Sequence, residues 1–385
     1  MKVRLGIDVR NLTQKRSGLV GYVTSLVSQL AADDHYDLVL FYNRTYRDYI
    51  TSLLPPNVTL IPLYFDPHFL SVKNFLFERF QLKKIITDQK LSLFHNPFGY
   101  GVPPHMPIPT LLTVHDVIPL AGGYDDLSLF QRYIFRQSLA TSVASASHIV
   151  AISAFTASEL KRCIPLAASR PISIVHNGYD DLTNIHYSAE KLASVHDKTF
   201  ILYLGSGVQR KNITNLVKAF IHFKKKTGSD SMLVVVSKFD RPETKKYKNA
   251  AQQLLRKEGL FDSVVFPGYL DQAQISYALR HCSAFIYPSF YEGFGLPILE
   301  AMAFDKPVIC SNIPPFHEIA GENNLFFDPH NVNDIAHAIE QVLTNDAVRA
   351  QLIKNAQERK NMFSWEKMVK EYELIYQQMA VRSDQ

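Results

Sequence analysis

Cysteine is scarce in this sequence. The chain contains only Cys163, Cys282 and Cys310, and no two of them have the Cys-x-x-Cys spacing. An odd number of widely separated cysteines argues against both a disulfide framework and a zinc site. We therefore expect free thiols and a reducing compartment.

Long apolar runs and a strong charge imbalance are also missing. No stretch approaches the length of a membrane span, and residues 1–8 indicate a first strand, not a signal peptide. The net charge of +5 is too mild to indicate a nucleic-acid partner, although it suits weak attraction to anionic lipid headgroups. The sequence thus predicts a cytoplasmic protein, with peripheral contact at the inner face of the cell membrane left open.

Two ligand-binding motifs do not occur. The chain has no Asp-x-Asp, which argues against a metal that bridges substrate phosphates. It has no Gly-x-Gly-x-x-Gly, which argues against a dinucleotide fingerprint. We therefore expect neither a metal nor a cofactor.

Alternating strands and helices are abundant, and they predict an α/β protein. A chain of 385 residues, 46% hydrophobic and 20% charged, suits two α/β domains. Strands separated by helical patterns imply parallel sheets with crossover helices. The predicted strands fall in two sets, which are Val3–Asp8, Leu38–Tyr42, Val58–Pro62, Leu91–Phe94, Thr110–Val114, His148–Ile152 and Ile172–Val175, and then Phe200–Gly205, Met232–Val236, Val264–Phe266, Ala284–Tyr287, Pro307–Cys310 and Leu325–Phe327.

The domain boundaries follow from these two sets. We expect a first domain at 1–185, a polar linker at 186–198 and a second domain at 199–363. A closing helix and tail are expected at 364–385, with Ser364 as the N-cap.

The most informative segment is 288–303, Pro-Ser-Phe-Tyr-Glu-Gly-Phe-Gly-Leu-Pro-Ile-Leu-Glu-Ala-Met-Ala. Its glycines allow a ligand to approach the backbone, and Pro297 is suited to the first position of a helix. The helix start would offer free amides and a positive dipole end to an anion. Glu292 and Glu300 would then contact sugar or ribose hydroxyls. The alternative is an ordinary strand–turn–helix in which Glu300 caps its own first turn.

A second phosphate-binding loop is predicted where strand Phe200–Gly205 leads into a helix. Arg210 and Lys211 lie near the start of that helix, where a diphosphate would meet both cations and dipole. Two adjacent cations in a solvated loop are the alternative.

The first half offers His115 and Asp116 at the end of a strand. A histidine there can donate to a phosphate or to a sugar hydroxyl, although His-Asp pairs are also common as loop contacts. His95 follows another strand, where it would line a pocket or sit at the edge of the core.

The chain resembles the retaining glycosyltransferases of family 4, and most closely bacterial mannosyltransferases and hexosyltransferases that build polysaccharides. The residues that carry the resemblance run along nearly the whole chain: Gly6-Ile-Asp-Val-Arg10, Ser17-Gly18, Thr113-Val-His-Asp116, Ile152-Ser153, His176-Asn-Gly178, Arg210-Lys-Asn212, Glu292 with Glu300, and Phe363-Ser-Trp365. The resemblance implies the GT-B fold, in which two Rossmann-like domains face each other across a cleft and the closing helix crosses back to the first domain.

The resemblance also implies the site. It gives Lys211, Arg210 and the backbone of Phe294, Gly295 and Leu296 to the donor diphosphate, Glu292 to the sugar, Glu300 to the ribose and His115 to the reacting centre. Gly18 and Ser206 would contact the donor, and no metal is required. Three positions depart from the family pattern. Gly21 replaces a usual side chain, Ser206 or Gly207 stands where an arginine is common, and Asp305 stands in place of a glycine.

The implied reaction moves a hexose from a nucleotide diphosphate sugar to a hydroxyl of a glycan or lipid-linked glycan in bacterial polysaccharide or lipopolysaccharide synthesis. GDP-mannose is the first choice of donor and a UDP-hexose the alternative. A non-catalytic nucleotide-sugar-binding protein and an epimerase or phosphorylase of the same fold remain competing hypotheses.

The segment 64–84 is aromatic and partly basic. An interfacial helix that docks on a membrane would have this composition. So would a helix packed on the sheet with its charges in water, which is the interpretation we favour.

Overall fold

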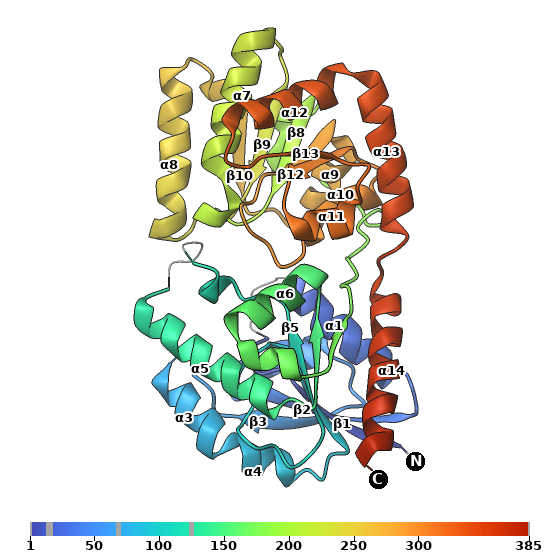
Figure 1. Ribbon diagram of the computed structural model, residues 1–385. Coiled ribbons are helices and arrows are strands. Elements are labelled where there is room, and N and C mark those ends of the chain that lie inside the picture. The colour runs from blue at the N-terminus through green and yellow to red at the C-terminus, as the bar shows by residue number, and fades with distance from the viewer. Residues whose placement is uncertain (1, 13–17, 67–70, 123–126, 384–385) are drawn as a thin grey trace. The chain divides into compact units, whose positions relative to one another are not determined.

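The computed structural model describes residues 2–12, 18–66, 71–122 and 127–383 (Figure 1). The chain divides into two compact units. The first contains Met1–Gly178 and Phe363–Gln385, and the second contains Tyr179–Met362. The last helix, α14 (Trp365–Ser383), therefore belongs to the first unit, as the resemblance implies.

A parallel sheet organises the first unit, with the strand order β3-β2-β1-β4-β5-β6-β7. The order reverses between β1 and β4, and doubly wound sheets bind ligands at the carboxyl ends of the strands beside such a reversal. The predicted strands of this half are confirmed with small differences at their ends. They are β1 (Val3–Asp8), β2 (Tyr36–Asn43), β3 (Thr59–Leu63), β4 (Leu93–Asn96), β5 (Thr110–Val114), β6 (His148–Ala151) and β7 (Ile172–Ile174).

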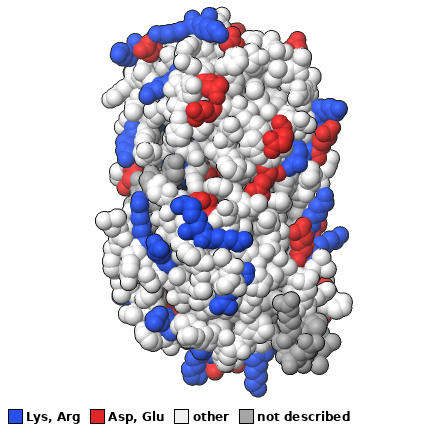
Figure 2. Space-filling view, in the orientation of Figure 1, with Lys and Arg blue, Asp and Glu red and all other residues white. Residues whose placement is uncertain are grey.

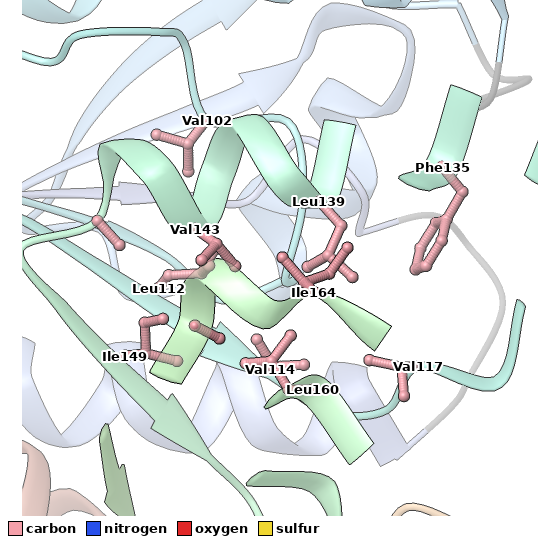
Figure 3. Close-up of a cluster of buried hydrophobic side chains, with 12 residues drawn as sticks. Val102, Leu112, Val114, Val117, Phe135, Leu139, Val143, Ile149, Leu160 and Ile164 are labelled. Carbon is pink, nitrogen blue, oxygen red and sulfur yellow. The ribbon is translucent and has the colours of Figure 1, made fainter. Parts of the chain in front are cut away.

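Helices cover this sheet and bury its apolar faces. Figure 3 shows one part of the core, a cluster of buried side chains in which Val143 lies beside Leu112 and Leu139 lies beside Ile164. The helices of the unit are α1 (Gly18–Ala31), α2 (Arg47–Leu53), α3 (Val72–Phe80), α4 (Leu82–Thr87), α5 (Leu129–Ser145), α6 (Ala154–Cys163) and α14, with the short 3-10 helices η1 (Arg44–Tyr46), η2 (Ile118–Leu120) and η3 (Pro165–Ser169).

The start of α14 is fixed by a cap and by a close backbone approach. Ser364 Oγ accepts a hydrogen bond of 3.2 Å from the Lys367 amide, as expected of an N-cap. Gly178 lies against this turn, because a Cβ atom there would come within 2.1 Å of the Trp365 nitrogen. Only glycine fits that position, so Gly178 has a structural role at the start of α14.

The second unit repeats the plan with a parallel sheet of order β10-β9-β8-β11-β12-β13. Its order reverses between β8 and β11. The predicted strands are again confirmed, as β8 (Phe200–Leu204), β9 (Met232–Val236), β10 (Val264–Gly268), β11 (Ala284–Tyr287), β12 (Val308–Ser311) and β13 (Leu325–Phe327). The helices are η4 (Glu190–Val195), η5 (Gln209–Lys211), α7 (Ile213–Thr227), α8 (Pro242–Lys257), η6 (Phe261–Ser263), α9 (Gln272–His281), α10 (Leu296–Ala303), α11 (Pro314–Ala320), α12 (Val332–Thr344) and α13 (Asp346–Lys360).

Residues 179–198 pack as part of the second unit. The sequence assigns 179–185 to the first domain and 186–198 to a linker, but η4 buries Leu192 and Val195. Upstream of η4, the Arg280 side chain donates to the Thr183 carbonyl at 2.6 Å. Polar composition hid these anchors, because η4 packs on α9 and Thr183 is held by Arg280 of the same helix, which lies far away in the sequence.

Every helix of the described ranges is either too short or too polar to span a bilayer. Cys163, Cys282 and Cys310 are free, and the last two are buried.

Candidate functional site

Two loops of the second unit meet at the reversal of its strand order. The first loop follows β8 and the second follows β11, and these strands are hydrogen-bonded neighbours. Lys211 Nζ lies 2.5 Å from Glu292 Oε1, and Arg210 Nη1 lies 2.6 Å from Glu292 Oε2. Lys211 and Glu292 are 8% and 7% exposed. The structure thus brings together the two cations and the first acidic residue that the sequence singles out.

Tyr287, at the end of β11, completes the surroundings of Lys211. Its hydroxyl accepts a hydrogen bond from Lys211 Nζ, and its ring centroid lies 4.7 Å from the same atom. Such a contact stabilises a desolvated ammonium group. Sequence analysis did not single out Tyr287, and its only signal is a polar aromatic residue at the end of an apolar strand.

Asn212 holds the two loops in register. It adopts the left-handed conformation, with φ of 58°, which Asn tolerates better than most residues. Its side-chain amide donates to the Pro288 carbonyl at 3.0 Å and to the Pro329 carbonyl at 2.8 Å. The Phe290 amide in turn donates to the Arg210 carbonyl at 2.9 Å. These contacts fix the backbone on which Lys211 and Glu292 stand.

The charge balance of this cluster is positive. Burial disfavours the carboxylate, but Lys211 and Arg210 outweigh that effect and lower the pKa of Glu292 to about 2. One anion therefore faces two cations, which leaves a net charge of +1 in a poorly solvated place. An anionic ligand is attracted there, and it would share the cations with Glu292.

The start of α10 adds hydrogen-bond donors beside the cluster. Gly295 has a φ of 139°, and a Cβ atom on it would come 3.0 Å from Phe316, so this turn requires glycine. Pro297 is the second residue of the helix, not the first as predicted. The amides of Gly295 and Leu296 donate to no acceptor within the described residues. Unpaired amides at a helix start favour an anion.

Glu300 lies about one turn into α10. Burial, together with the charge of Asp180, raises the pKa of Glu300 to about 7. Its carboxyl makes no hydrogen bond with other described residues, so it does not cap its own helix. A carboxyl of this kind is available to a ligand hydroxyl. Ser206, in the loop after β8, has an exposed side chain.

In the first unit, His115 follows β5 and is oriented by a backbone carbonyl. Its Nε2 lies 2.9 Å from the Pro97 oxygen, and its ring packs edge-on to Tyr22 at 4.8 Å. Burial lowers the pKa of His115 to about 4. The neutral ring donates through Nε2, so Nδ1 carries the lone pair. In this geometry the free Nδ1 can accept a hydrogen bond from a hydroxyl but cannot donate one to a phosphate, and the sequence leaves both possibilities open.

The other candidate side chains of the first unit, Asp116 and His95, make contacts within that unit. Asp116 accepts from the Ile118 amide at 3.0 Å and so supports its own loop. His95 is fully buried, with Nδ1 2.8 Å from the Tyr376 hydroxyl and Nε2 2.9 Å from Thr113 Oγ1. It anchors α14, so it is a core histidine. Gly18 begins α1 and is exposed, while Ser17 lies outside the described residues.

A buried ionic network, which sequence analysis did not find, lies under the ends of β1 and β4. Arg10 Nε is 2.9 Å from Asp8 Oδ2, and Arg10 Nη1 is 3.5 Å from Glu78 Oε1. Asn96 donates to Asp8 at 3.0 Å. A charged residue just after an apolar strand was its only signal. No group of three His, Cys, Asp or Glu that could hold a metal occurs in the part of the chain that the structure describes.

Family models match both halves of the chain. The model "Glycosyltransferase Family 4" matches residues 16–181, and the model "Glycosyl transferases group 1" matches residues 186–359. The serotype-specific mannosyltransferase WbdA of Escherichia coli is 31% identical over 280 residues, which are 68% of this chain and 32% of that protein. This chain therefore spans about a third of the length of that relative. The O-antigen chain mannosyltransferase B of E. coli is 28% identical over 365 residues, covering 91% of this chain and 93% of that protein.

Solved structures share the fold over almost the whole length. Sucrose-phosphate synthase from Thermosynechococcus elongatus has a TM-score of 0.77 at 19% identity, covering 99% of this chain and 100% of its own. HepE of Anabaena, in complex with UDP and glucose, has a TM-score of 0.73 at 16% identity, covering 98% of this chain and 100% of its own. The fold, with its two Rossmann-like units, is GT-B.

Proposed function

The chain belongs to the glycosyltransferases of family 4, which have the GT-B fold, and from this premise we propose that it transfers a hexose from a nucleotide diphosphate sugar to a hydroxyl acceptor with retention of configuration. One observation carries the proposal. Lys211, Arg210 and the unpaired amides of Gly295 and Leu296 gather at two neighbouring strand ends of the second unit. That combination suits a diphosphate whose negative charge grows as it leaves.

The second unit binds the donor at its diphosphate and at the two groups that the diphosphate joins, the sugar and the ribose. Lys211, Arg210 and the backbone of Phe294, Gly295 and Leu296 stabilise the leaving group, and a donor of this kind is worth about 3 kcal/mol in the transition state. Glu292 binds hydroxyls of the sugar while it keeps part of its pairing with the cations. Glu300 binds the ribose.

The remaining roles rest on the resemblance. His115 accepts a hydrogen bond from a hydroxyl of the transferred sugar through Nδ1, and Gly18 and Ser206 contact the donor. No carboxylate attacks the sugar covalently, because the acceptor approaches from the face that the diphosphate leaves. The leaving phosphate takes the proton of the acceptor, and the reaction needs no metal.

The curated relatives point to mannose. Two of them are named as mannosyltransferases, and one of these is named for the O-antigen chain. We therefore propose GDP-mannose as the donor and a glycan or lipid-linked glycan of bacterial polysaccharide synthesis as the acceptor. A UDP-hexose is the second candidate, since the HepE structure of the same fold holds UDP and glucose. A lipid-linked acceptor would place the protein at the inner face of the cell membrane.

A panel of nucleotide sugars tests the donor. A ligand at a hundred times its dissociation constant stabilises a protein by about 2.7 kcal/mol, so the true donor raises the unfolding temperature and the wrong bases do not. We expect GDP-mannose to stabilise the protein and to release GDP when a glycan acceptor is added. Stabilisation without release would identify a non-catalytic binding protein, and conversion of the donor without an acceptor would identify an epimerase.

A further inference from the structure

Contacts within the first unit hold His115 in one orientation. Its Nε2 donates to the Pro97 carbonyl at 2.9 Å, and its own carbonyl accepts from Thr156 Oγ1 at 3.3 Å. The ring of Tyr22, on α1, lies 4.8 Å from the imidazole between centroids, with an angle of 86° between the two planes. Edge-to-face packing of this kind is favourable and directional. The Pro97 contact therefore sets which nitrogen carries the proton, and the Tyr22 contact sets the plane of the ring.

The Tyr22 hydroxyl reaches the strand that leads to His115. It donates to Thr113 Oγ1, on β5, at 3.3 Å. Thr113 and His115 are two residues apart, and side chains at that spacing along an extended chain point to the same face of a sheet. Tyr22 thus contacts both side chains, Thr113 with its hydroxyl and His115 with its ring. A side chain held at both ends has a fixed position along the strand.

Thr113 is the centre of a buried hydrogen-bond network that includes α14. Its Oγ1 lies 2.8 Å from the Tyr372 hydroxyl and 2.9 Å from His95 Nε2. His95 Nδ1 in turn lies 2.8 Å from the Tyr376 hydroxyl. A hydroxyl group can donate once and accept twice, so Tyr22, Tyr372 and His95 use every hydrogen-bonding position of Thr113. These side chains have no exposed area, and a buried network that is fully satisfied specifies one arrangement.

Helix α14 also packs on the ring of Tyr22. Trp365 and Tyr372 lie on one face of α14, and their ring centroids are 6.4 Å and 6.0 Å from that of Tyr22. Helices α1 and α14 are neighbours in the first unit, as Figure 1 shows. The final helix of the chain therefore supports Tyr22 in two ways, through the Thr113 network and through ring packing.

The groups that support Tyr22 are uncharged. Figure 2 shows Lys, Arg, Asp and Glu side chains on the surface, whereas the network consists of hydroxyls and an imidazole. Burial raises the pKa of Tyr22 and of Tyr372, and it lowers the pKa of His95 to about 3. The network therefore keeps its charge and its hydrogen bonds throughout the neutral pH range.

We propose that Tyr22 is a positioning residue for His115 and that α14 acts on the reacting centre through it. The inference rests on the proposed function, in which His115 Nδ1 accepts from a hydroxyl of the transferred sugar. Tyr22 keeps the imidazole in the plane that this hydrogen bond requires, and its ring covers part of the imidazole against water. A displacement of about 1 Å at a reacting group costs roughly a hundredfold in rate.

The protonation of His115 reports on this packing. His115 is half-buried, and burial lowers the pKa of its imidazole to about 4. The titratable groups around it include Tyr22 of α1, His95 of β4 and the adjacent Asp116. Without the Tyr22 ring, water reaches the imidazole, and its pKa should rise toward the ordinary value of 6.5. A charged imidazole has no lone pair on Nδ1 and no longer accepts from the sugar hydroxyl.

Two substitutions of Tyr22 in the full chain separate its ring from its hydroxyl. Tyr22→Leu removes the ring, and the kcat of sugar transfer should fall roughly a hundredfold. Tyr22→Phe keeps the ring and loses only the hydrogen bond to Thr113, so kcat should fall roughly threefold. The KM for the donor should stay the same in both variants, because residues of the second unit bind the donor diphosphate.

Matched variants measure the effect of lost packing alone. Phe41→Leu removes a buried ring that packs edge-on to Phe94 at 5.8 Å, and Ser142→Ala removes a buried hydroxyl that accepts from the Val102 amide at 3.0 Å. Both lie in the first unit and should keep the wild-type kcat. Equal kcat in Tyr22→Leu and Phe41→Leu would overturn the proposal. If Tyr22→Leu does not fold, equal kcat in Tyr22→Phe and Ser142→Ala would overturn it instead.

NMR titration of the His115 imidazole is a second readout, and it needs no substrate. His115→Gln identifies the signal among those of the other histidines. We expect the imidazole to be neutral at about pH 5 in the wild type and in Phe41→Leu, and charged in Tyr22→Leu. An identical titration in all three proteins would contradict the proposal. A wild type that transfers no sugar would refute the proposed function alone, since this titration would still decide whether Tyr22 holds His115.

Discussion

Glu292→Gln is the most informative single substitution in the second unit. It keeps the shape of the side chain and removes the negative charge that faces Lys211 and Arg210. The two cations then remain in a poorly solvated place without the negative charge of Glu292 to balance them. We expect the variant to be less stable than the wild type, because removing one partner of a buried ion pair is strongly unfavourable.

The size of the effect follows from the pKa of Glu292. That pKa falls from its ordinary value of 4.5 to about 2, and each pH unit is worth about 1.4 kcal/mol. The pairing therefore contributes about 3 kcal/mol, in line with the 3–5 kcal/mol that breaking a buried ion pair typically costs. For a unit of this size, a loss of about 3 kcal/mol should lower the unfolding temperature of Glu292→Gln by roughly 6–12 °C. Because the folded pKa is the lower one, the contribution is fully present above pH 4.5 and is lost as the pH falls toward 2.

Calorimetric unfolding with and without pyrophosphate is the assay. Glu292→Gln should unfold earlier at pH 7, and pyrophosphate should stabilise it more than the wild type, since the anion replaces the missing charge. Glu340→Gln is the matched control, because Glu340 pairs with Lys226 at 2.6 Å on the exposed surface, where ion pairs contribute at most about 1 kcal/mol. A variant as stable as Glu340→Gln, or one that pyrophosphate does not rescue, would refute the reasoning.

Further substitutions test the geometry of both units. Gly295→Ala forces a side chain into a backbone angle of 139° against Phe316, so the free energy of unfolding should fall by about 2 kcal/mol in denaturant titration; an unchanged midpoint would contradict the turn. Tyr376→Phe removes the hydrogen bond to the buried His95 and should lower stability by about 1–3 kcal/mol, whereas Tyr269→Phe on the surface should not. Chelation of divalent metal should leave the rate of sugar transfer unchanged, and a rate restored only by added metal would contradict the proposed mechanism.

Much of the fold could be predicted because buried parallel strands are continuous apolar runs. Met232–Val236 is such a strand, and the structure places it between β8 and β10. The position of the site could be predicted for a related reason. Carboxyl ends of neighbouring strands meet, so Lys211 after β8 and Glu292 after β11 had to lie close to each other.

The details that sequence analysis missed all depend on contacts between distant side chains. Spacing alone did not show that Glu292 pairs with both cations, and a pattern of single residues did not reveal the network of Asp8, Arg10 and Glu78. In the segment 64–84, helix α3 buries Asn74 and Glu78 and exposes Val72, Leu76 and Phe80, a division that composition alone did not give. Composition shows that a helix is amphipathic, but the partners of Asn74 and Glu78 decide which face is buried.

Calorimetric titration of GDP into the wild type and into Lys211→Met tests most directly whether the second unit holds the diphosphate of a nucleotide sugar. Loss of one charged hydrogen-bond donor, which contributes about 1.5–3 kcal/mol to ground-state binding, predicts GDP binding roughly 10- to 100-fold weaker in Lys211→Met, with Lys218→Met unchanged. GDP that binds Lys211→Met as tightly as it binds the wild type would contradict this account.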